Sequence, residues 1–134
     1  MDDFENSPLV RTDFSDDAAW LSLVRAAAAQ SPDGFQAYLR IVDDRRFKDC
    51  SAADLIDRGE GWDQAAVLFV ADAHALRDPE QAILCVDLID QPGRSFRCIP
   101  SELWGVDNNL SLANMAFDEF ATAVDRGGVH RGFG

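Results

Sequence analysis

The chain has 134 residues, of which 47% are hydrophobic and 27% are charged, as in an ordinary globular domain. Its 24 acidic residues outnumber 12 basic ones and give a net charge of −12, which repels phosphate backbones and anionic lipids and makes nucleic acids and membranes poor partners. Three scattered cysteines lack the paired spacing of a zinc site and the clustering of a disulfide framework.

The N-terminal part predicts an acidic tail, a strand and a helix. Residues 1–7 contain no long apolar run, so we expect a flexible tail, no signal peptide and a cytoplasmic protein. Residues 8–14, "PLVRTDF", open with Pro and are partly β-branched, which predicts a strand. A helix is predicted over 15–30, with Ser15 as its N-cap and Trp20 on its apolar face.

The middle of the chain predicts four strands and a short helix. Alternating apolar and polar residues predict a strand over 35–44, and a capping-box pattern predicts a helix over 51–59 that ends at a glycine. The continuous apolar run 65–72 is typical of a strand covered on both faces. Residues 83–89 and 95–99 are joined by a short Pro-Gly connection, which favours an antiparallel hairpin.

The C-terminal part predicts a helical turn after Ser101, a final helix over 116–125 and a flexible tail over 126–134. The stretch before the final helix is ambiguous. Because Leu110 and Leu112 alternate with polar or small residues, it is either extended or the first turn of a longer final helix.

Strands that alternate with helices imply a parallel sheet with right-handed crossovers. The order β-α-β-α-β-β-β-α therefore predicts one α/β domain over 8–125, with a mixed sheet of about five strands, three of them parallel and two in a hairpin, and about three helices. The sequence leaves the oligomeric state open, because an exposed strand edge could also pair with a second copy.

Acidic residues follow each of the three parallel strands. Asp13 ends the first strand, Asp43 and Asp44 end the second, and Asp72 ends the third, followed by His74. If these strands are neighbours, the carboxylates converge at the edge where α/β sheets bind ligands, and they could hold a divalent cation such as Mg²⁺. The structural alternative is that Asp is simply common at strand ends and helix N-termini.

No nucleophile elbow, P-loop or dinucleotide-binding motif is present, so we assign no catalytic residue, no metal ligand and no cofactor. His74 is the one credible acid–base residue. The basic cluster 45–48, "RRFK", either balances neighbouring acids or forms a small anion site. The side-chain amides of Asn108 and Asn109 either satisfy nearby backbone groups or contact a ligand. Two tryptophans beside glycines, Trp62 and Trp104, are predicted to be exposed anchors for a partner.

The segments "RTDF", "PSEL" and "NNLSLANM-F-EF" resemble a family of small bacterial domains, frequent in actinobacteria, that carries only a domain-of-unknown-function label. The resemblance spans about 8–125 and implies a single domain without an established activity. It places the first and last of these segments together, with Arg11 paired to Asp72 or Asp87 and Asn109 tying the last helix to the sheet. Ala116 departs from the family pattern, which has a polar or acidic helix cap there.

The leading hypothesis is a non-catalytic acidic domain that binds a protein partner, preferably a basic one. The alternatives are a domain that binds a small molecule or a divalent metal, and a small enzyme. Both would use the strand-end carboxylates or His74, and the candidate ligand-binding residues are Arg11, Asp13, Asp72, His74, Asn108 and Asn109.

Overall fold

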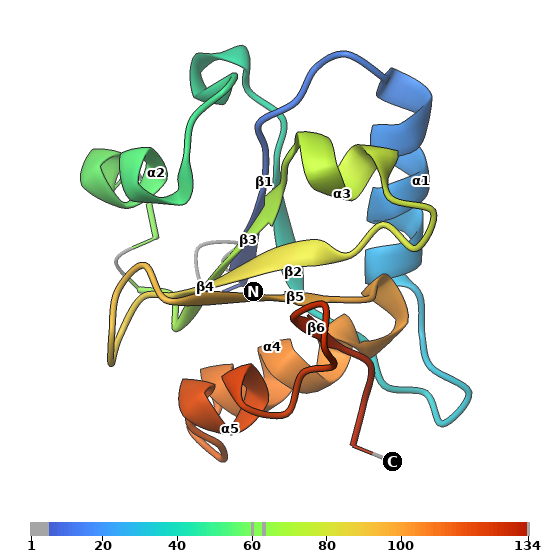
Figure 1. Ribbon diagram of the computed structural model, residues 1–134, viewed down its shortest axis with the longest axis vertical. Coiled ribbons are helices and arrows are strands. Elements are labelled where there is room, and N and C mark those ends of the chain that lie inside the picture. The colour runs from blue at the N-terminus through green and yellow to red at the C-terminus, as the bar shows by residue number, and fades with distance from the viewer. Residues whose placement is uncertain (1–5, 60, 63, 134) are drawn as a thin grey trace.

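A mixed six-stranded sheet of order β2-β1-β3-β4-β5-β6 forms the centre of the computed structural model, which describes residues 6–59, 61–62 and 64–133 (Figure 1). The predicted α/β class is confirmed. The strands are β1 (Ser7–Arg11), β2 (Leu39–Val42), β3 (Val67–Ala71), β4 (Ile83–Asp87), β5 (Ser95–Cys98) and β6 (Val129–His130). The α-helices are α1 (Asp17–Ala28), α2 (Ala52–Arg58), α3 (Ala73–Arg77), α4 (Leu103–Ser111) and α5 (Phe117–Ala121), and the 3-10 helices are η2 (Arg45–Phe47) and η3 (Pro100–Glu102).

Helices cover both faces of the sheet. The larger core cluster includes Trp20 of α1, Leu103 of α4 and Phe120 of α5. The second cluster packs Phe47 and Leu55, from η2 and α2, against the other face. Figure 1 shows α2 on the opposite side of the sheet from α4 and α5. Every residue of β3 is buried, as its continuous apolar run predicted.

The strand directions match the predicted combination of parallel strands and a hairpin. β1 pairs in parallel with β2 on one side and with β3 on the other, and β4 and β5 form the antiparallel hairpin. After β1 the chain passes to α1 on one face, and after β2 it passes to η2 and α2 on the other face. The carboxyl ends of β1 and β2 therefore flank a point where the connections diverge, which is where open α/β sheets form ligand crevices.

Helix capping follows the sequence with one correction. The N-cap of α1 is Asp16, not Ser15, because the Asp16 carboxylate accepts the backbone N–H of Ala19 at 3.0 Å. The capping box of α2 is confirmed in both directions, and the helix ends at Gly59 with a left-handed φ of 58°.

The stretch around Leu110 that was ambiguous in the sequence forms the end of helix α4. Both predictions for it, an extended segment and the first turn of the final helix, are therefore wrong. Leu103, Val106 and Leu110 lie on its buried face at helical spacing, whereas Leu112 lies beyond its end and is exposed. The helix ends in a Schellman motif: Ala113 N–H donates to Leu110 O, and Asn114 N–H donates to Asn109 O. Ala113 holds the left-handed position with φ 57°, where glycine is usual, so the sequence lacks the usual stop signal.

Besides α4, the elements η2, α3 and β6 were not predicted. α3 is five residues long and follows β3 directly. β6 lies within the stretch predicted to be a C-terminal tail, pairs in parallel with β5 and buries His130. At the other end, Ser7 was assigned to the acidic tail but begins β1 and is buried, while residues 1–5 fall outside the described part. None of the helices among the described residues is both long and apolar enough to cross a membrane.

Candidate functional site

The carboxyl ends of β1, β2 and β3 lie together at one edge of the sheet, as the sequence predicted, but their acids have local partners. Asp13 accepts the backbone N–H of Ser15 at 2.7 Å, and hydrogen bonds from Ser15 lower the pKa of its carboxyl group. Asp72 caps α3 by accepting the Ala75 N–H, and it forms a bidentate ion pair with Arg97. Within residues 6–59, 61–62 and 64–133, no group of three or more His, Cys, Asp or Glu side chains could hold a metal ion.

Arg11 is the centre of this edge. Its side chain is only 4% exposed, and its Nε donates to the carbonyl of Asp13 at 2.8 Å. Nη2 donates to Asp17 at 2.7 Å, and Nη1 reaches Asp43 at 3.5 Å. The guanidinium also stacks on the ring of Phe14, with 4.5 Å from Cζ to the ring centroid. The expected pairing of Arg11 with Asp72 or Asp87 is therefore wrong.

A cavity of about 570 Å³ opens beside Arg11, between the ends of β1 and β2. Its apolar wall comes from side chains at the start of α1 and just before it, and its polar wall comes from Arg11 and the residues after β2. Arg45 contributes a second guanidinium, which lies 5.1 Å from the centroid of the Phe14 ring. The lining residues are Arg11, Phe14, Asp17, Trp20, Leu21, Asp43 and Arg45. Sequence reasoning singled out Arg11 and the 45–48 cluster, but it gave no reason to bring them together.

His74 does not belong to this constellation. It lies exposed on α3 and interacts electrostatically with Asp72, whose carboxylate is held by Arg97. The histidine placed in the interior is His130, which was assigned to the tail. Its ring packs against Phe120 and Phe133, with centroids 5.2 and 4.9 Å away, and its Nδ1 has no hydrogen-bond partner.

The asparagine stretch satisfies backbone groups. The side-chain N–H of Asn109 donates to Gly105 O at 2.8 Å, and the backbone carbonyl of Asn109 accepts the N–H groups of Asn114 and Met115. Asn108 reaches the carbonyl of Gln36 at 3.4 Å and so contacts the segment before β2. These contacts explain both amides without a ligand.

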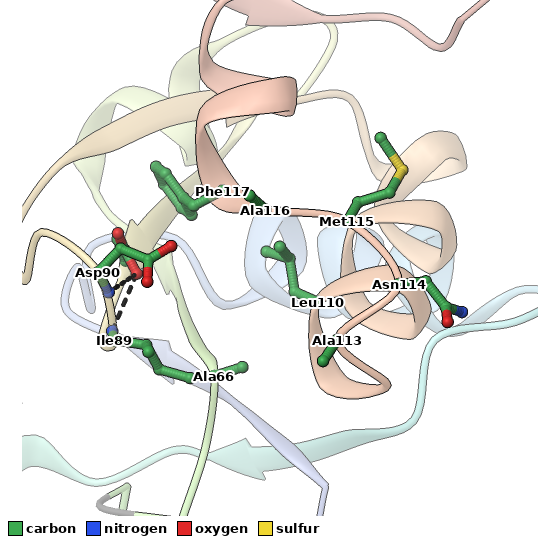
Figure 2. Close-up of a pocket in the computed structure, with 10 residues that line it drawn as sticks. Ala66, Ile89, Asp90, Leu110, Ala113, Asn114, Met115, Ala116 and Phe117 are labelled. Carbon is green, nitrogen blue, oxygen red and sulfur yellow. Dashed lines mark hydrogen bonds between the residues drawn. The ribbon is translucent and has the colours of Figure 1, made fainter.

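A second cavity, of about 260 Å³, lies between the turn after β4 and the link from α4 to α5 (Figure 2). Figure 2 shows Asp90 and Ile89 on one side and Leu110 and Ala113 on the other. The carboxylate of Asp87, which also lines it, accepts backbone N–H groups from Ile89, Asp90 and Gln91. That carboxylate is therefore engaged by the backbone of the turn and is not free to bind a ligand in this cavity.

The two candidate partner-binding tryptophans differ in exposure. The indole of Trp62 is 3% exposed, and its Nε1 donates to Leu55 O at 2.8 Å, so the prediction that it is exposed is wrong. Trp104 is half-buried and stacks on Phe35, with ring centroids 4.8 Å apart and an interplanar angle of 13°.

Large apolar side chains are exposed along the edge strand β2. Phe35 and Tyr38 precede the strand and are 50% and 55% exposed, and Ile41 within it is 43% exposed. Leu21 of α1 is 51% exposed and lines the same cavity as Asp43, which follows β2. We call the apolar residues Leu21, Phe35, Tyr38, Ile41 and Trp104 the β2 edge surface.

Comparison with family models identifies one match, over residues 6–133, to the family described as "Domain of unknown function (DUF6924)". The chain belongs to this family. The resemblance to a small domain of unknown function is thus confirmed, and the matched region includes the Arg11 cavity, the asparagine stretch and β6. No curated protein matches the chain.

Proposed function

We propose that this domain is a non-catalytic protein-binding module that docks a partner on the β2 edge surface. The observation that carries this proposal is the position of β2 at the end of the sheet, with apolar side chains exposed on both sides of the strand. Edge strands offer unpaired backbone N–H and C=O groups, and proteins usually protect them with charged residues, proline or a covering element.

Both faces of the edge contribute. Ile41 lies opposite Leu9 in the parallel register, so its side chain points to the face of the sheet that α1 covers. Tyr38 is three residues earlier, and because side chains alternate along extended backbone, we expect it to point to the other face. A partner segment added in extended form would bond to the backbone of β2 and rest its alternating side chains on these two residues. Aromatic side chains such as Tyr38 and Trp104 are favoured anchors at interfaces.

The partner we propose is a basic protein. The net charge of −12 attracts a basic partner over long range and opposes the association of two copies of the chain. We place the interaction in the cytoplasm, since the cysteines Cys50, Cys85 and Cys98 remain free thiols.

The test is a pull-down from a cell lysate that compares the proteins retained by the immobilised wild-type chain with those retained by Ile41→Lys. This substitution puts a charge on the edge strand. Ile89→Lys, at a residue that is 64% exposed on the far hairpin turn, is the matched control. We expect a partner that is retained by wild type and control, lost with Ile41→Lys, and weakened as salt rises. Equal capture by all three chains would refute the β2 edge surface as the docking site, and a wild-type dimer in sedimentation that Ile41→Lys abolishes would identify the partner as a second copy.

A further inference from the structure

We propose that the cavity beside Arg11 binds a small ligand with a carboxylate or phosphate group attached to a planar or apolar body. This site shares only Leu21 with the β2 edge surface, and the proposal does not depend on docking there. The sequence hypothesis of a cation held by the strand-end acids is replaced here by an anion held by arginine.

The first argument is that Arg11 is a fixed cation with exchangeable counter-ions. Its side chain is 4% exposed, whereas the side chains of its partners Asp17 and Asp43 are 80% and 48% exposed. A buried guanidinium needs an anion, but exposed carboxylates lose little when they return to water. An incoming carboxylate or phosphate can therefore take the place of Asp17 at small cost.

The second argument concerns the donors that remain. Arginine has five N–H groups in a planar fork that suits the two oxygens of a carboxylate or phosphate. In Arg11, Nε is fixed by the carbonyl of Asp13 at 2.8 Å, while the contact of Nη1 with Asp43 is at the 3.5 Å limit of a hydrogen bond. The hydrogen bond to the Asp13 carbonyl fixes the orientation of the guanidinium group. Its Nη1 and Nη2 contact Asp43 and Asp17, which both line the cavity.

The third argument is the second cation. Arg45 lines the same cavity and stacks on Phe14, and no carboxylate among the residues that the structure describes forms an ion pair with it. Once Asp17 turns to solvent, Arg11 and Arg45 outnumber Asp43 and the cavity carries a net positive charge. This happens in a chain whose overall charge is strongly negative.

The walls define the rest of the ligand. The cavity of about 570 Å³ is in the range of small-molecule sites. Phe14, Trp20 and Leu21 provide an apolar surface next to the two guanidinium groups. A ring or short apolar chain would lie against this surface while its anionic group reaches Arg11. The location also agrees with the divergent connections after β1 and β2.

The experiment is a calorimetric and NMR titration of the full chain with phenyl phosphate, benzoate and inorganic phosphate, at constant ionic strength set with sodium chloride. We expect saturable binding of phenyl phosphate or benzoate that is tighter than binding of inorganic phosphate, because the last lacks the apolar body. Tighter binding of phenyl phosphate than of benzoate would indicate that the natural ligand carries a phosphate group, and the reverse order would indicate a carboxylate.

Two exposed substitutions test the geometry without disturbing the core. Arg45→Gln should weaken binding about ten-fold, the equivalent of one lost charge-assisted hydrogen bond. Asp17→Asn should strengthen binding, because it removes the competing internal anion. Asp118→Asn, at a 65% exposed carboxylate that pairs with Arg94 of the β4–β5 turn, is the control for net charge and should leave affinity unchanged.

The proposal fails if no probe at 10 mM binds the wild type or Asp17→Asn, because that concentration would nearly saturate a site with a Kd of about 1 mM. It also fails if Arg45→Gln binds as tightly as wild type, or if Asp17→Asn and Asp118→Asn strengthen binding equally, since that result would reflect only the change in net charge.

Discussion

Arg97 donates hydrogen bonds to both carboxylate oxygens of Asp72, from Nη1 to Oδ1 at 3.0 Å and from Nη2 to Oδ2 at 2.7 Å. The pair joins β5 to the cap of α3, although β3, which leads into that cap, is two strands away from β5. Burial raises the pKa of Asp72, but the hydrogen bonds from Arg97 and from Ala75 N–H outweigh it and leave the pKa below its usual value.

Because the folded-state pKa of Asp72 is lowered, its contribution to stability is complete above the ordinary aspartate pKa of about 3.9 and is lost as pH falls below it. Asp72→Asn should lower the free energy of unfolding by about 1–3 kcal/mol at pH 7. Urea titrations at pH 7 and at acidic pH measure this, and the gap between wild type and variant should narrow in acid. A constant gap would contradict the role of the charge.

A second prediction concerns Asp107, a buried carboxylate of α4 that forms no ion pair within the part of the chain that the structure describes. It accepts the Ser7 hydroxyl, the Ser111 hydroxyl at 3.2 Å and the Tyr38 N–H at 2.8 Å, so it connects α4 to β1 and to the start of β2. Burial raises the pKa of Asp107. The folded chain thus holds the proton more tightly than the unfolded chain, and this group makes the protein less stable as pH rises above about 3.9.

Asp107→Asn should keep all three contacts, since its oxygen can accept from Tyr38 and its amide can donate to the serine hydroxyls. We expect its stability at pH 7 to be equal to or above that of wild type. Asp107→Ala should cost about 2–4 kcal/mol, because the N–H of Tyr38 loses its acceptor and a small void forms. Thermal and urea unfolding of the two variants would check the contrast, and an equal loss in both would rule out hydrogen bonding as the cause.

A third prediction follows from His130. Burial lowers its pKa, and a hydrogen bond to the carbonyl of Ala123 opposes that effect only in part. The folded state therefore excludes the proton, and stability is complete above the ordinary histidine pKa of about 6.5 and falls as the pH drops below it. We expect hydrogen exchange of the Val129 and His130 amides to accelerate between pH 7.5 and 5.5, after correction for intrinsic rates.

His130→Phe should remove that pH dependence, because phenylalanine fits among the surrounding rings and carries no proton. Glu102, the charged group that contributes to the pKa of His130, is retained in this variant and serves as an internal control. If the variant shows the same acceleration as wild type, the effect comes from another group.

A fourth prediction concerns the end of α4. Ala113 occupies the left-handed position with φ 57°, where a Cβ atom costs about 1 kcal/mol. Ala113→Gly should therefore raise the free energy of unfolding by about 0.5 kcal/mol after the entropy of glycine is subtracted. Ala113→Val should lower it by about 1–2 kcal/mol, since a branched side chain is strained further. A glycine variant that unfolds more easily than wild type would contradict the assigned motif.

The sequence predicted the elements with strong local signals. The buried run of β3, the capping box of α2 and the hairpin of β4 and β5 each depend on residues within one short segment, and all three are present. α4 was missed because Leu112 extends an apparent alternation with Leu110, and because Ala113 replaces the glycine that normally marks a helix end. β6 was missed because a two-residue strand has no periodicity, and only its neighbours make it a strand.

The candidate site was predicted only in part for a similar reason. Topology placed the strand-end residues at one edge, but side-chain pairing decides what such an edge can bind. Arg97 binds Asp72 from a position 25 residues away that no spacing rule connects, whereas the bond from Ser15 N–H to Asp13 is a local Asx turn. The meeting of Arg11, Phe14 and Arg45 depends on the turn after β2, which brings together residues more than 30 positions apart.

The parallel pairing of β1 with both neighbours has a consequence for biosynthesis. β1 is made first, but its partner β2 ends at Val42 and its partner β3 ends at Ala71. A ribosome adds roughly 5–20 residues per second, so the strand waits for several seconds before its inner partner emerges from the exit tunnel. During this time Leu9 and Val10, which are fully buried in the finished domain, remain open to any chaperone that binds short apolar segments of nascent chains.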